Sequence, residues 1–167
     1  RQMCIRDRNR TNMKLKMNIL WLLMLLCLPF VSSCKEDLPA YGEAEITKVG
    51  FYHKYYGPDK DGLTGENISV NKELQCRYTI NNDAATVDCI VTVPAADNKY
   101  TESIRAEVSQ SKLAGYMKVS TAAHVIPIED APTLGVPGDW THTNKYVVKA
   151  ADGTEKVWTV RITEFKK

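Results

Sequence analysis

The 167-residue chain contains 22 basic and 20 acidic residues. Six of the basic residues but only one of the acidic residues precede position 34, so residues 34–167 carry 16 basic and 19 acidic side chains, a net charge of −3. This balance provides no basic patch of the kind that nucleic-acid binding requires. The 134 residues from Cys34 onward are enough for one domain with its own hydrophobic core.

The first twelve residues have no apolar periodicity and include four arginines. We expect residues 1–12 to be an upstream or non-native segment, with the natural start at Met13 or Met17, and exclude them from the fold.

A short apolar segment follows. Lys14 and Lys16 precede residues 19–31, an apolar run of 13 residues. A membrane-spanning helix needs about 20 residues, so this run is too short to span but suits the core of a signal peptide. Two serines and then Cys34 follow directly. The pattern predicts a signal peptide over residues 13–33, with either a lipid-modified or a free cysteine at its end.

Small residues followed at once by a cysteine resemble the lipobox of bacterial lipoproteins, which implies cleavage before Cys34 and acylation of that residue. Several acyl chains anchor a protein firmly. Lys35-Glu36-Asp37 is similar to the export signal of Bacteroidetes surface lipoproteins, although it also suits the start of a solvated linker over residues 34–43. The resemblance implies a lipid-anchored protein on the outer face of the outer membrane.

From residue 44 to residue 167 the sequence is typical of an all-β domain. Short runs rich in Val, Ile, Thr and Tyr are broken every 8–12 residues by Gly, Pro, Asn or Asp, and no stretch keeps a helical period for three turns. We predict a β-sandwich of about seven strands. The expected strands are 44–53, 74–81, 84–93, 102–109, 115–120, 143–150 and 156–164.

The first predicted hairpin contains two cysteines. A two-residue turn at Asn82-Asp83 would place Cys76 directly opposite Cys89 on an apolar face. Directly opposed residues can be close enough for a disulfide, which an oxidising compartment would favour. Two buried free thiols are the alternative.

The second predicted hairpin has an odd-length loop. Only a loop such as 151–153 aligns Tyr146 with Trp158 on one face, and Gly153 would then be left-handed in a bulged turn.

Residues 146–154 and 158–162 resemble the closing hairpin of Bacteroidetes lipoproteins with an immunoglobulin-like or cadherin-like β-sandwich, and residues 104–108 and 139–141 also fit that family. The resemblance implies a single immunoglobulin-like sandwich. Some members accompany glycan-capture systems, so it also implies glycan binding, and it provides no catalytic residues.

No catalytic or metal site emerges from the sequence. His53, His124 and His142 are far apart in the sequence, and no nucleophile is grouped with a base. Residues 59–66 differ from a calcium loop because Gly62 is the fourth rather than the sixth residue, so we expect a solvated turn. We therefore expect no enzymatic activity, cofactor or metal.

Aromatic residues near loops are the candidate ligand contacts. Tyr55 and Tyr56 precede a Gly-Pro break, and Trp140 lies in a Pro/Gly-rich segment. Aromatic faces stack on sugar rings and loops often bind ligands, although each residue could instead belong to the core. We expect a lipid-anchored, non-catalytic protein that binds polysaccharide, or alternatively a structural or adhesion subunit that packs on a partner surface protein.

Overall fold

The structure is a computed structural model that describes residues 41–167. The predicted signal peptide at 13–33, the predicted lipid site Cys34 and the export-like residues 35–37 lie outside the described residues. Within residues 41–167, no helix is long and apolar enough to cross a membrane.

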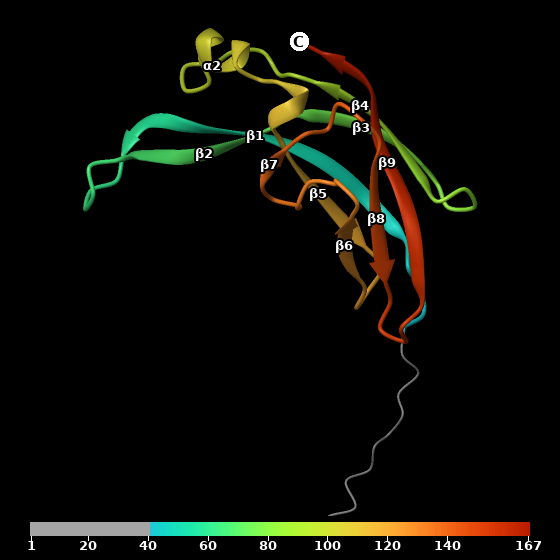
Figure 1. Ribbon diagram of the computed structural model, residues 1–167. Helices are drawn as coiled ribbons and strands as arrows, with labels where there is room; N and C mark the ends of the chain where they lie inside the picture. Colours follow the sequence, from blue (N-terminus) through green and yellow to red (C-terminus); the bar gives the residue numbers. More distant parts are fainter. Residues whose placement is uncertain (1–40) are drawn as a thin grey trace, which may run out of the picture. The chain divides into compact units, whose positions relative to one another are not determined.

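Two sheets form the domain (Figure 1). The strand order is β2-β1-β5-β7 in the first sheet and β3-β4-β9-β8-β6 in the second. All pairs are antiparallel except β4 with β9. The strands are β1 (Ile46–Lys60), β2 (Asn67–Glu73), β3 (Gln75–Asn81), β4 (Thr86–Thr92), β5 (Leu113–Val119), β6 (His124–Ile128), β7 (Pro137–Gly138), β8 (Asn144–Lys149) and β9 (Glu155–Lys166). The predicted all-β sandwich is confirmed, with nine strands in the described part rather than about seven.

The predicted strand at 102–109 is wrong. Residues 102–106 form a short helix, α2 (Glu102–Ala106), and a 3-10 turn, η2 (Gln110–Lys112), follows. Thr101 caps α2 by accepting from the amide of Ile104, and Glu102 pairs with Arg105 one turn later at 2.8 Å. These local interactions outweigh the alternating pattern that suggested a strand.

The hairpin of β3 and β4 has a different register from the predicted one. Tyr78 pairs with Cys89 and Cys76 pairs with Val91, a shift of two residues that lengthens the turn and keeps the same face inward. Ala85 adopts a positive φ of 49° in this turn. Cys76 and Cys89 are therefore diagonal neighbours rather than an opposed pair, and both are free thiols.

The second hairpin matches its prediction. Tyr146 pairs with Trp158, and the amide of Ala150 donates to the carbonyl of Thr154 across a three-residue loop. Gly153 is left-handed, with φ 92°. Glycine occupies this conformation without the steric cost that a Cβ atom would add.

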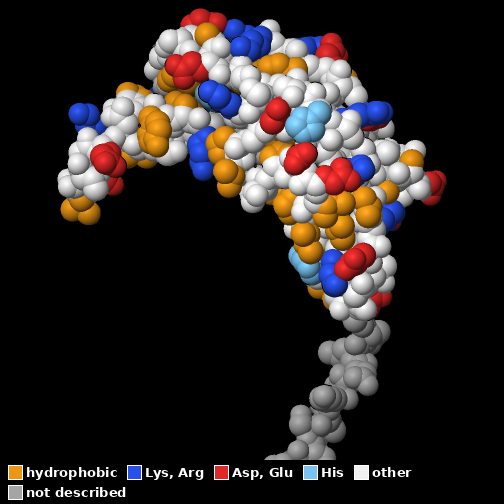
Figure 2. Space-filling model, viewed as in Figure 1, with side chains coloured by type: hydrophobic (Ala, Val, Ile, Leu, Met, Phe, Trp, Pro, Cys, Tyr) orange, Lys and Arg blue, Asp and Glu red, His pale blue; other side chains and the backbone are white. Residues whose placement is uncertain are grey.

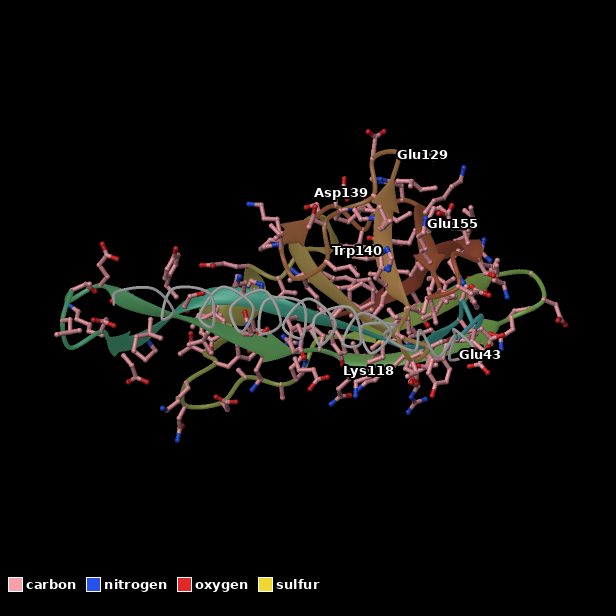
Figure 3. The ribbon with its side chains drawn as sticks, turned by 90° about the horizontal axis from the view of Figure 1, so that it is seen from below. Glu43, Lys118, Glu129, Asp139, Trp140 and Glu155 are labelled. Atoms are coloured by element: carbon pink, nitrogen blue, oxygen red, sulfur yellow. The ribbon has the colours of Figure 1, made fainter. Side chains whose placement is uncertain are left out.

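Large aromatic residues fill the space between the sheets. Trp140 is 0% exposed, contacts Phe51 edge-on at 4.9 Å and stacks on Tyr146 at 6.0 Å between ring centres. Its indole nitrogen donates to the carbonyl of Leu113 at 3.0 Å. Figure 3 shows Trp140 among packed side chains, whereas Glu129 points outward. The prediction that Trp140 contacts ligand is wrong, because this residue is part of the core.

Strands β1 and β2 extend beyond the rest of the first sheet as a two-stranded arm (Figure 1). The segment between β4 and α2 is attached to the arm by two ion pairs, Lys72 with Asp97 at 2.6 Å and Lys99 with Asp59 at 3.3 Å. Tyr100 of this segment packs against Tyr55 of the arm, with 5.7 Å between ring centres. Such contacts matter because an isolated two-stranded hairpin is only marginally stable in water.

Candidate ligand-binding face

The outer face of the first sheet carries tyrosine and lysine side chains. Side chains alternate along β1, so Phe51, His53 and Tyr55 are buried while Lys48, Tyr52, Lys54 and Tyr56 are at least partly exposed on the other side. Tyr116 and Lys118 of β5 lie on the same outer side, because Tyr116 pairs with Gly50 and Lys118 pairs with Lys48. We call Lys48, Tyr52, Lys54, Tyr56, Tyr116 and Lys118 the tyrosine face.

Gly50 allows the side chain of Tyr116 to lie across β1. A Cβ atom at position 50 would overlap the ring and hydroxyl of Tyr116. A glycine within a strand is typical of such a close approach. The Tyr116 ring in turn stacks on Tyr52, with 4.9 Å between ring centres and 26° between ring planes. The result is an aromatic surface held in a fixed orientation.

An open hollow of about 320 Å³ adjoins Tyr116, one member of this aromatic pair. The hydroxyl of Tyr116 donates to the Glu73 carboxylate at 2.8 Å, and the amino group of Lys48 lies 5.5 Å from the centre of the Tyr116 ring. Hydrogen bonding with Tyr116 raises the pKa of Lys48, and burial followed by the contact with Glu73 raises the pKa of Tyr116. The lining residues are Lys48, Val49, Glu73, Leu74, Gln75, Cys76, Tyr78 and Tyr116.

The thiol of Cys76 also lines the hollow. A hydrogen bond with Cys89 lowers the pKa of Cys76 and raises that of Cys89, which is fully buried. The carboxylate of Glu73 is part of the same lining, where it accepts the hydrogen bond from Tyr116. The thiol of Cys76 offers a polarisable surface in the hollow.

Comparison with family models and solved structures identifies the relatives of this domain. The model of the DUF5018-related family matches residues 46–161. The chain belongs to this family. A crystal structure of a candidate secreted protein from Bacteroides fragilis is 52% identical, with a TM-score of 0.71, and the match covers 77% of this chain and 100% of that one. No curated protein matches.

Of the three predicted ligand contacts in this DUF5018-related domain, only Tyr56 is freely accessible, at 73% exposed. Tyr55 lies on the inner side of β1 beneath Tyr100, so its assignment as a ligand contact is wrong. The sequence interpretation missed Tyr52 and Tyr116. The alternation of side chains along β1 could have indicated that Tyr52 faces outward. Tyr116 lies next to Tyr52 only because β1 pairs with β5.

The other sequence features have structural explanations in the described residues. Asp61 accepts hydrogen bonds from the amides of Leu63 and Thr64, which makes residues 61–64 a side-chain-capped turn as expected. His53 is buried, at 6% exposed. Within residues 41–167, no group of three or more His, Cys, Asp or Glu side chains could hold a metal ion.

Proposed function

We propose that this protein binds polysaccharide on the tyrosine face. The supporting observation is the fixed Tyr52–Tyr116 pair beside an open hollow that contains Glu73, Gln75 and Lys48. Aromatic rings provide flat apolar surfaces for the C–H faces of sugars, and the polar side chains can exchange hydrogen bonds with hydroxyl groups. Binding sites of this kind combine an apolar surface with a few convergent polar groups. We propose binding without catalysis.

A native affinity-gel screen of residues 41–167 against plant and host polysaccharides tests this function. We expect retardation by at least one polysaccharide, and its loss in Tyr116→Ala. Tyr41→Ala is the matched control, because Tyr41 is 60% exposed and lies at the start of the domain beside Asp152 of the β8–β9 turn. Equal loss in both variants, or retardation that persists in Tyr116→Ala, would contradict the proposed site.

We also propose that Cys34 is acylated and tethers the domain to the outer surface of the outer membrane. This proposal rests on the lipobox-like and export-like residues and agrees with the secreted Bacteroides relative. In cells, Cys34→Ala should abolish labelling by palmitate and release the protein from the membrane fraction. Replacing residues 35–37 by alanine should keep the label but remove accessibility to protease added outside the cells.

The arm supports a second candidate function, docking on a partner surface protein. Figure 2 shows hydrophobic side chains along the arm and at its tip, where Leu63 is 99% exposed and Ile68 is 43% exposed. In the described part, β2 is an edge strand with β1 as its sheet neighbour. Exposed edges and apolar side chains favour protein contacts. Cross-linking on intact cells that is lost in Leu63→Ser and kept in Tyr116→Ala would favour this alternative.

A further inference from the structure

The tyrosine face carries more basic than acidic side chains among the described residues. Lys48 and Lys118 are paired across β1 and β5, and Lys54 follows further along β1 on the same side. Like charges directly opposite each other destabilise a sheet. The ion pairs among the described residues include none of these three lysines.

The carboxylate that interacts with Lys48 is already engaged. Glu73 accepts the Tyr116 hydroxyl at 2.8 Å, and it is the single carboxylate among the groups that act on the pKa of Lys48. Strand register places Ser69, Asn71 and Glu73 of β2 beside the outward positions of β1, so Glu73 is the one acidic residue among the paired positions that neighbour the three lysines. Residues 34–167 have a net charge of −3, so this local excess is opposite in sign to the rest of the chain. A charge excess confined to one face indicates the charge of its ligand.

We infer that the ligand is an acidic polysaccharide, with carboxylate or sulfate groups that contact Lys48 and Lys118. This inference rests on the proposed function and adds the ligand class. The sugar rings stack on Tyr52 and Tyr116. These rings lie next to the lysine pair because Gly50 and Tyr116 form the next register pair on the same face of the sheet. An anionic group within reach of both lysines forms charge-assisted hydrogen bonds and relieves their mutual repulsion.

The test uses pairs of polysaccharides that differ mainly in charge. Residues 41–167 are run in affinity gels with polygalacturonate or its highly methyl-esterified form, and with chondroitin sulfate or chondroitin whose sulfates have been removed and whose carboxylates have been reduced to alcohols, at low and moderate salt. We expect retardation by the acidic member of at least one pair and weaker retardation as salt increases. Lys48→Gln and Lys118→Gln should each weaken binding about five- to tenfold, since hydrogen bonds to charged groups are among the stronger polar contacts. Lys145→Gln on β8 makes the same change in net charge on the other sheet and should bind as the unmodified protein does.

The other outcomes separate the two claims. Equal binding of charged and neutral members, unchanged in the lysine variants but lost in Tyr116→Ala, would overturn the preference for acidic ligands and leave the proposed function standing. Acidic binding that Lys145→Gln weakens as much as Lys48→Gln, or that Tyr116→Ala does not affect, would reveal nonspecific ion exchange and contradict the inference. No retardation by these polysaccharides or by any member of the wider plant and host panel would overturn both claims.

Discussion

Gly50 illustrates how one residue can determine the shape of a binding surface. Its missing side chain makes room for Tyr116 to lie across β1. We predict that Gly50→Ala displaces the Tyr116 ring and abolishes polysaccharide retardation. The domain should remain folded, because the clashing atoms belong to the outer end of a partly exposed side chain. Affinity gels and circular dichroism check the two expectations, and retained binding in a folded Gly50→Ala protein would contradict the role assigned to Tyr116.

The burial of His53 predicts that the stability of the domain depends on pH. The residue is buried, neither ring nitrogen has a hydrogen-bond partner in the described structure, and burial lowers its pKa from the usual value of 6.5. The groups around it are Tyr55 and Tyr100 in ring contact, with Glu107 raising and Lys167 lowering the pKa. As the pH falls below about 6.5, the His53 side chain becomes protonated in the unfolded chain but stays neutral in the folded chain. Stability should then decrease until the pH reaches the folded-state pKa.

Urea unfolding between pH 7.5 and pH 5 measures this effect. We expect a slope of at most about 1.4 kcal/mol per pH unit from His53, lost in His53→Phe. His124→Gln is the control, because His124 is exposed on β6. An unchanged slope in His53→Phe would assign the pH dependence to other groups.

At the scale of elements, the β3–β4 register determines the chemistry of the two cysteines. Diagonal neighbours on antiparallel strands lie about 7–8 Å apart, at the limit that a disulfide tolerates without backbone movement. We therefore predict that Cys76 and Cys89 remain free thiols, in contrast to the disulfide that an opposed pairing suggested. Purified residues 41–167, unfolded without reductant, should react with two equivalents of a thiol reagent. Fewer than one equivalent would indicate the disulfide and a rearranged turn.

The arm depends on the segment that packs against it. Tyr100 contacts Tyr55 and His53, and Lys72 lies over the Tyr100 ring at 4.9 Å. We predict that Tyr100→Ala increases amide hydrogen exchange in β2 more than in β8, because β8 packs between β6 and β9 in the other sheet. Val125→Ala, a partly buried position on β6, is the control. Equal increases in β2 and β8 would show that Tyr100 stabilises the whole domain.

Local patterns predicted most of the strands, because alternation and turn residues act over a few positions. The β8–β9 loop could be inferred from the faces of Tyr146 and Trp158 alone. The length of the β3–β4 turn could not be inferred in this way, since a shift of the register by two residues keeps the same side chains on the buried face. Residues 102–106 alternated like a strand, but the cap by Thr101 and the Glu102–Arg105 pair form a helix.

The candidate site could be predicted only in part, because it is assembled from distant segments. Tyr56 was identified from its place near the end of the first strand. Tyr116 and Lys118 reach Tyr52 and Lys48 only through sheet pairing over more than 60 positions of the chain. No basic run in the sequence indicates this face, since its lysines are separated by tyrosine, glycine and other residues on two strands. Trp140 looked like a loop residue, yet its Pro/Gly-rich segment folds inward over Phe51.

At the scale of the whole molecule, the proposed binding face of the described domain lies along β1. Tyr41, at the start of the described residues, lies against the β8–β9 turn through the hydrogen bond from the Asp152 amide to its carbonyl. β1 then runs from Ile46 toward the arm. The tyrosine face thus begins near the end of the domain where the chain enters and continues toward the arm.

The most direct test of the central claim is hydroxyl-radical footprinting of the domain with and without a polysaccharide that retards it in the affinity gels. This measurement reports the solvent access of individual tyrosine side chains. The account predicts that ligand lowers oxidation of Tyr52, Tyr56 and Tyr116, while Tyr41 is unchanged and serves as an internal control. Protection confined to Tyr41 or to other residues outside the tyrosine face would contradict the account.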